Sequence, residues 1–176
     1  MAADSTNGEF REFKKMKIWS EKKSSYKCIM LYPRWFDVTW GFPPHWLWNC
    51  YEETSDENIE VAKLMSVCWL NVRGQFKMSE LSSGVVYEIA YIVKLTKEGF
   101  GWEFPVTLKL KVPEGREQKR QYSLLEKPIG EWIELIGGSF QAKEGETREV
   151  SFDIIEHGGH WKSGLILKGI IIRPKH

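Results

Sequence analysis

The chain has few of the features that mark secreted or membrane-spanning proteins. Its 176 residues include only three cysteines, Cys28, Cys50 and Cys68, whose spacing matches no disulfide framework. A sparse, odd cysteine set is typical of reduced thiols in an intracellular protein. There is no Asn-x-Ser/Thr acceptor, no signal-peptide-like run in the first thirty residues, and no segment with the roughly 20 apolar residues that span a bilayer. We therefore expect a cytosolic protein without membrane insertion, with the nucleus as a second compartment.

An excess of one charge sign is also missing. The chain carries 25 basic and 24 acidic residues, a net charge of +1, and so has no global field to attract nucleic acid or an anionic membrane. Basic residues gather only near the amino end, in KKMK at 14–17 and EKKSSYK at 21–27. We interpret this segment as a solvated tail in preference to a nucleic-acid-binding arm, because no aromatic motif accompanies it.

Recognisable catalytic and metal-binding motifs are absent as well. The sequence has no Gly-x-Ser-x-Gly and no glycine-rich phosphate loop, and its Gly-Gly pairs at 137–138 and 158–159 are interpreted as turns. His157 and His160 alone do not complete a zinc site, and no pair of carboxylates stands out among the 24 acids. We expect a binding protein with no catalytic residues, no cofactor and no metal.

The hydrophobic pattern has a period of two over most of the chain. Residues 106–112 alternate apolar and polar, and 67–74 and 85–95 each place a row of apolar residues on one strand face. Residues 132–140, 148–155 and 164–174 are predicted as further strands. Only 58–65 has a mixed period, consistent with a helical turn or a short edge strand. The prediction is an all-β antiparallel β-sandwich, jelly-roll-like, with at most a short helical turn. Residues 1–25 are expected to be a flexible polar extension and 26–176 a single domain.

Aromatic residues are abundant: nine Trp lie in the chain, and three of them lie in VTWGFPPHWLW at 38–48. Core packing and an exposed aromatic surface are both open for each of Trp40, Trp46 and Trp48. Burial of all three is disfavoured because a Pro-Pro turn lies at the surface. In an extended segment, Trp46 and Trp48 share one face. Large rigid rings of this kind stack on the apolar C–H faces of sugars, while polar neighbours bind the hydroxyl groups.

Four blocks of this sequence resemble the plant phloem lectin domain, the phloem protein 2 family, which is shared with the tobacco jasmonate-inducible lectin. The blocks occur in the family's order over residues 28–175, and they are FDVTWGFPPHWLW, IEVAKLMSVCWLNVRGQF, GEWIELIGGSF and HWKSGLILKGIIIRPK. The resemblance implies a β-sandwich lectin that binds N-acetylglucosamine oligomers (chito-oligosaccharides and the N-glycan core) without metal or catalysis. It also implies a cytosolic, nuclear or phloem-sap location and a homodimer.

The resemblance also implies site residues. The family's sugar-stacking Trp falls on Trp40, its second aromatic motif on Trp46 and Trp48, and its acidic site residue on Glu156. Trp161 and Lys162 belong to the same closing block, in which Trp161 is open to a role in the core or in the site. Three segments depart from the family pattern: the GFPPH loop, the HGGH turn, and GREQKR, a weak equivalent of the family's nuclear signal.

Two further interpretations stay open. Trp69 is expected to pack structurally on its strand, and Trp102 to lie at the rim of the site or to stabilise a turn. The alternative function is an interaction module that has lost sugar binding and serves protein or RNA partners in phloem.

Overall fold

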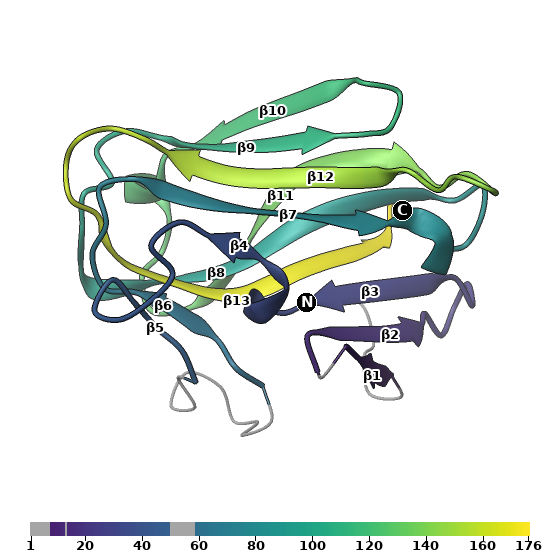
Figure 1. The fold of residues 1–176 in the computed structure, drawn as a ribbon, viewed down its shortest axis with the longest axis horizontal. Helices are drawn as coiled ribbons and strands as arrows, with labels where there is room; N and C mark the ends of the chain where they lie inside the picture. Colours follow the sequence, from purple (N-terminus) through teal and green to yellow (C-terminus); the bar gives the residue numbers. More distant parts are fainter. Residues whose placement is uncertain (1–7, 13, 50–58) are drawn as a thin grey trace.

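The computed structural model describes residues 8–12, 14–49 and 59–176, which fold largely into β-strands (Figure 1). The strands are β1 (Glu9–Arg11), β2 (Met16–Ser20), β3 (Lys27–Leu31), β4 (Asp37–Val38), β5 (Trp46–Leu47), β6 (Ala62–Leu64), β7 (Leu70–Lys77), β8 (Val86–Phe100), β9 (Val106–Lys111), β10 (Glu117–Tyr122), β11 (Trp132–Gln141), β12 (Glu149–Glu156) and β13 (Ser163–Pro174). The helical elements in this part of the chain are short 3-10 turns, η1 (Pro33–Trp35), η3 (Met78–Glu80) and η4 (Leu124–Glu126). None of the described helices is of the length and apolarity that crossing a membrane requires.

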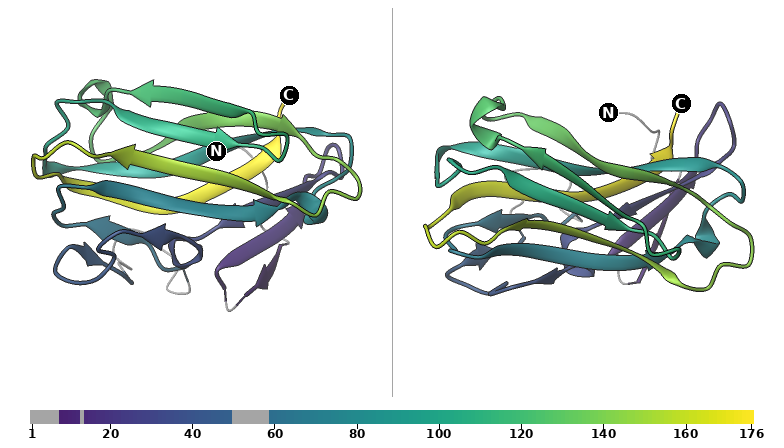
Figure 2. Two further views of the ribbon diagram at one scale, coloured as in Figure 1. Left: turned by 45° about the horizontal axis from the view of Figure 1, so that its top comes forward. Right: turned by 90° about the horizontal axis from the view of Figure 1, so that it is seen from above.

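Two antiparallel sheets lie face to face, and the predicted all-β sandwich is confirmed (Figure 2). One sheet has five strands in the order β10-β9-β12-β7-β4. The other has eight strands arranged around β13, which pairs with β8 along one edge and with β3 and β6 along the other. Strand β11 pairs with the far edge of β8, and β2 extends the sheet beyond β3.

Alternation along the strands fills the space between the sheets. Val106, Leu108 and Leu110 of β9 are fully buried, and their polar neighbours face outward. Across the core, Phe36 and Phe152 meet edge to face with ring centroids 5.6 Å apart. Edge-to-face contacts of this kind place the positive ring edge on the negative ring face and add to the hydrophobic gain. The period-two pattern therefore identified the buried faces of these strands.

The amino-terminal segment differs from the expected flexible extension of residues 1–25. Residues 16–20 form β2, which pairs with all of β3, and both Ile18 and Trp19 are only 5% exposed. The polar sequence around Ile18 and Trp19 hid this strand, because two apolar residues between lysine clusters are too few to establish a period. The sandwich therefore begins on the amino-terminal side of residue 26.

The segment with a mixed period is a strand in its described part. Residues 62–64 form β6, which pairs with β13 on one side and β5 on the other.

Cys28 is buried and unbridged, and burial raises the pKa of its thiol to about 12, so it stays protonated. Cys68 is also a free thiol, whereas Cys50 lies outside the described residues.

The strands of the five-stranded sheet bring four loops together at one end of the sandwich, on the left in Figure 1. Leu70 at the start of β7 lies opposite Glu156 at the end of β12, and Ile155 lies opposite Thr107 at the start of β9. Strand β4 ends beside Val72 of β7. Loops 39–45, 65–69, 101–105 and 157–162 therefore share this end, which we call the loop end.

Candidate functional site

Trp40 lies on the loop end with its ring half exposed. Its indole is 51% exposed and lies 4.7 Å from the ring of His45, centroid to centroid. His45 is itself fixed, because its Nδ1 lies 3.0 Å from the Ser66 carbonyl and its own carbonyl accepts the Met65 N–H at 2.8 Å. Trp40 has a φ of 55°, a left-handed conformation that is unfavourable for a bulky residue. An exposed Trp held in such a conformation is a candidate for a functional residue.

The structure separates the three tryptophans of the 38–48 segment. Trp46 is only 1% exposed, because β5 pairs it with Leu64 and its ring enters the core. The expectation that Trp46 stacks on a sugar is therefore not supported by its position. Trp48 is half-buried: its indole N–H donates to the Gly41 carbonyl at 3.0 Å, and the Arg34 guanidinium lies 4.0 Å from its ring centroid. Trp48 therefore stabilises the loop that contains Trp40.

Glu156 and Lys162 form a buried ion pair at the base of loop 157–162. The Lys162 side chain is fully buried, and its Nζ lies 2.8 Å from Glu156 Oε2. The same ammonium donates to the carbonyls of Gly158 and His160, each at 3.1 Å, and to that of Cys68. The family resemblance assigns Lys162 to the site, but the structure places its ammonium in the protein interior, where protein groups already bind it. Three converging backbone carbonyls and one carboxylate replace the water that its charge requires.

The carboxylate of Glu156 also holds this loop. Its Oε1 accepts the Gly158 N–H at 3.0 Å, and its side chain is 11% exposed. Burial raises the pKa of Glu156, but Lys162 and the Gly158 N–H favour the ionised form and bring its pKa below the ordinary value. Glu156 is therefore charged at neutral pH. With so little of it exposed, its contacts organise the loop more than they offer oxygens to a ligand.

Two more exposed tryptophans come from neighbouring loops. Trp161 lies in the loop that Lys162 holds and is 50% exposed. Of the two placements left open for Trp161, the core and the surface, the structure shows the surface. Trp69 is 54% exposed and stacks on His157 at a centroid distance of 4.2 Å and an interplanar angle of 20°. Trp69 packs against His157 at the surface and not in the core, on the strand face opposite Leu70 that alternation predicted. Trp102 is buried and donates its N–H to the Ser163 carbonyl at 3.0 Å, so it stabilises the turn.

The histidines of the HGGH turn serve different contacts. His157 stacks on Trp69, whereas His160 Nε2 lies 2.9 Å from the Gly101 carbonyl and 3.3 Å from Glu156 Oε2. Within residues 8–12, 14–49 and 59–176, no three His, Cys, Asp or Glu side chains are placed to hold a metal ion. The loop end thus offers three half-exposed indole rings, at Trp40, Trp69 and Trp161, on a base of fixed polar groups.

Comparison with known sequences places this chain in a family. The family model described as Phloem protein 2 matches residues 26–174. The chain belongs to the phloem protein 2 family. It is 40% identical to a protein named Lectin from Luffa acutangula, over 97% of this chain and 81% of that protein. It is 39% identical to Protein PHLOEM PROTEIN 2-LIKE A1 of Arabidopsis thaliana, over 92% of this chain and 67% of that protein.

The matched phloem protein 2 region starts just before β3 and ends at the last residue of β13. It contains the whole loop end, whereas β1 and β2 lie outside it. Among solved structures, the chain is similar to the CBM22-1 xylan-binding domain from Paenibacillus barcinonensis. That similarity has 15% identity, a TM-score of 0.42, and coverage of 79% of this chain and 85% of that chain. A likeness of this size does not bear on function.

Proposed function

We propose that this protein is a lectin, which binds carbohydrate at the loop end without catalysing a reaction. The observation that carries the proposal is the gathering of Trp40, Trp69 and Trp161, each about half exposed, at one end of the sandwich. Membership of a family whose relatives include a protein named Lectin supports it. No catalytic step is required of these residues.

Exposed indole rings gain free energy when a ligand covers them. A half-exposed Trp leaves on the order of 100 Å² of apolar surface in water, so covering it is worth about 2.5 kcal/mol at ~25 cal/mol per Å². A sugar provides an apolar C–H face for such a ring, and its hydroxyls find polar groups on the surrounding loops. Covering two or three rings gives weak to moderate binding after the cost of ordering the ligand is subtracted.

In this proposal Glu156 and Lys162 are positioning residues. Their ion pair and the carbonyls around Lys162 fix the backbone at Cys68, next to Trp69, and in the loop 157–162, which carries Trp161. Trp48 does the same for the loop of Trp40. The rings are thereby held in place before the ligand arrives, which lowers the entropy cost of binding.

We further propose N-acetylglucosamine oligomers as the ligand, on the basis of the family resemblance. The acetamido methyl adds an apolar group that an indole ring can cover, and successive sugar units can reach successive rings. A homodimer would present two sites and raise the effective affinity for glycans that carry several copies of the ligand. The phloem proteins among the relatives support a location in phloem sap or cytosol.

Isothermal titration calorimetry with N-acetylglucosamine, chitobiose and chitotriose tests this proposal. We expect saturable heat that increases in affinity with oligomer length, and a loss of binding in Trp161→Ala. Tyr26→Ala is the matched control, since Tyr26 is 41% exposed and lies in the turn between β2 and β3, away from the loop end. No heat with any of the three sugars would contradict the ligand. Binding of RNA that weakens with salt would favour the alternative interaction module.

A further inference from the structure

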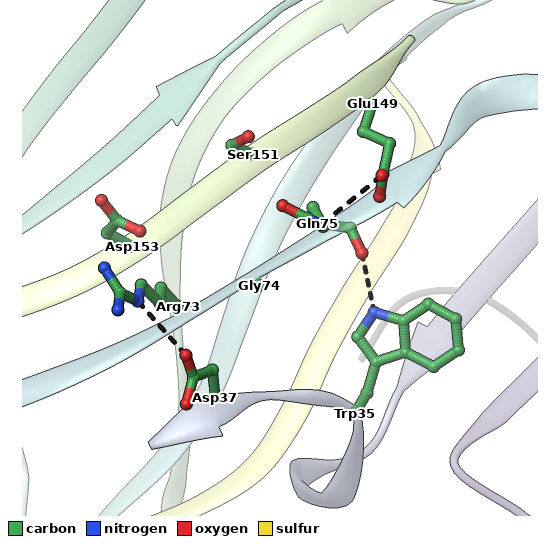
Figure 3. A pocket seen from close by; sticks show the side chains of 8 residues that line it. All are labelled: Trp35, Asp37, Arg73, Gly74, Gln75, Glu149, Ser151 and Asp153. Atoms are coloured by element: carbon green, nitrogen blue, oxygen red, sulfur yellow. Dashed lines mark hydrogen bonds and ion pairs between the residues drawn. The ribbon is translucent and has the colours of Figure 1, made fainter. Parts of the chain in front are cut away.

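A groove lies on the outer face of the five-stranded sheet (Figure 3). It has a volume of about 590 Å³, within the range of small-ligand sites. It is bounded by η1 and β4 on one side and by β12 on the other, and its lining includes Trp35, Asp37, Arg73, Gln75, Ser151 and Asp153. Six residues of extended chain separate Gln75 from Trp69, about 20 Å, so the groove extends well beyond the exposed rings.

The strand register explains how these side chains come together. Arg73 of β7 lies opposite Asp153 of β12 and Asp37 of β4, and Gln75 lies opposite Ser151. All five project outward, because their chain neighbours fill the core. Trp35 forms the wall of the groove, fixed by a hydrogen bond of 2.8 Å from its indole N–H to the Gln75 carbonyl.

Several polar side chains of the groove make few or weak contacts with the protein itself. Asp153 and Ser151 are half-buried, and among the described residues their side chains make no hydrogen bond or close ion pair, although the charges of Lys109 and Arg73 act on Asp153. Burial raises the pKa of Asp153, consistent with a carboxyl that lacks a donor. Arg73 approaches Asp37 only to 3.5 Å, with both side chains mostly exposed. A ligand would therefore meet available donors and acceptors without breaking strong contacts.

The charges of the groove nearly cancel. Asp37, Glu149 and Asp153 supply three negative charges and Arg73 one positive charge. At the border, Lys109 and Lys111 of β9 lie opposite Asp153 and Ser151 and supply two more positive charges, and Glu117 adds one negative charge that acts on Asp153. A balanced field attracts neither anions nor cations strongly. Mixed donors and acceptors beside an indole ring suit a neutral ligand rich in hydroxyl groups.

We propose that this groove is a second carbohydrate subsite, which takes a neutral oligosaccharide separately from the loop end. The choice of carbohydrate as the ligand class rests on the proposed function, whereas the location rests on the groove itself. The subsite gives one domain two contact regions for a glycan, so a branched or long chain can engage both.

Nuclear magnetic resonance of the ¹⁵N-labelled chain, titrated with chitotriose or cellotriose to millimolar concentration, tests the proposal. We expect saturable shifts of the Trp35 indole N–H and of the Gln75 and Ser151 amides. Arg73→Ala and Asp153→Ala should each weaken the groove response by about tenfold, the effect of a lost hydrogen bond to a charged group, and leave the Trp161 response unchanged. Glu144→Gln, on an exposed loop, is the matched control.

Each remaining outcome has one meaning. Shifts at Trp40 and Trp161 with none in the groove for either sugar overturn the second subsite and leave the proposed function intact. Shifts in the groove with none at the loop end support the subsite and contradict the loop-end site. Silence at both places contradicts both. Shifts at Trp35 caused by an acetylated, amidated Lys-Gly-Lys peptide and by neither sugar overturn the ligand class.

Discussion

Replacing Lys162 with Met should destabilise the protein severely. The substitution keeps the aliphatic part of the side chain and removes only the ammonium, which is the ion-pair partner of Glu156. Glu156, with its side chain 11% exposed, would then be a buried carboxylate without its cation at 2.8 Å. The carbonyls of Cys68, Gly158 and His160 would lose their common donor. Removing one partner of a buried pair costs about 3–5 kcal/mol. For a domain of this size that corresponds to a drop in Tm of roughly 6–20 °C.

Urea unfolding followed by far-ultraviolet circular dichroism measures this cost, and a double-mutant cycle with Glu156→Gln isolates the pair. The double variant should be more stable than the sum of the two single effects predicts, by about 0.5–3 kcal/mol, because neither buried charge is then left alone. A loss under about 1 kcal/mol in Lys162→Met, or strict additivity, would refute the reasoning that buried charges hold this loop.

Three other changes test the account. In urea unfolding, Trp40→Gly should be about as stable as the wild type and roughly 1 kcal/mol more stable than Trp40→Ala, since glycine accepts the φ of 55° without strain. In calorimetry, Trp40→Gly should nevertheless lose chitotriose binding. Trp46→Ala should cost about 3–5 kcal/mol by the same unfolding assay because its ring is in the core, and a near-neutral effect would contradict that placement. The hydrogen-bonded Arg173 guanidinium lowers the pKa of Glu134 in the folded state. The ion pair therefore stabilises the protein fully at a pH above the Glu134 pKa of the unfolded chain, near 4.5, and this contribution is lost as the pH falls through the Glu134 pKa of the folded protein. Glu134→Gln should therefore lower the Tm at pH 7 and reduce its fall between pH 5 and pH 2, relative to the wild type.

The sandwich was predictable from the sequence because several strands of the five-stranded sheet alternate between buried and outward-facing residues. Buried and outward-facing residues alternate along 106–111, and they alternate in the same way along most of β12. Strand β2 escaped prediction because Ile18 and Trp19 are held by pairing with β3 and not by a local pattern. Pairing between segments is a tertiary effect that a short polar stretch does not reveal.

The family resemblance predicted which residues belong to the proposed site, but it did not show which of the rings are exposed. Trp46 is in the core, whereas Trp69 is exposed and stacks on His157. Periodicity shows which residues share a face, and only packing shows whether that face is covered. The burial of Lys162 was equally hidden, because it depends on backbone carbonyls from two separate loops.

Oxidative footprinting read by mass spectrometry, with and without chitotriose, tests the central claim most directly. We expect saturating chitotriose to protect Trp40, Trp69 and Trp161 from oxidation, while the exposed Tyr26 reacts equally in both samples and the buried Trp46 stays unreactive. Equal oxidation of all three loop-end tryptophans with and without the sugar would contradict the claim that these rings form the carbohydrate site.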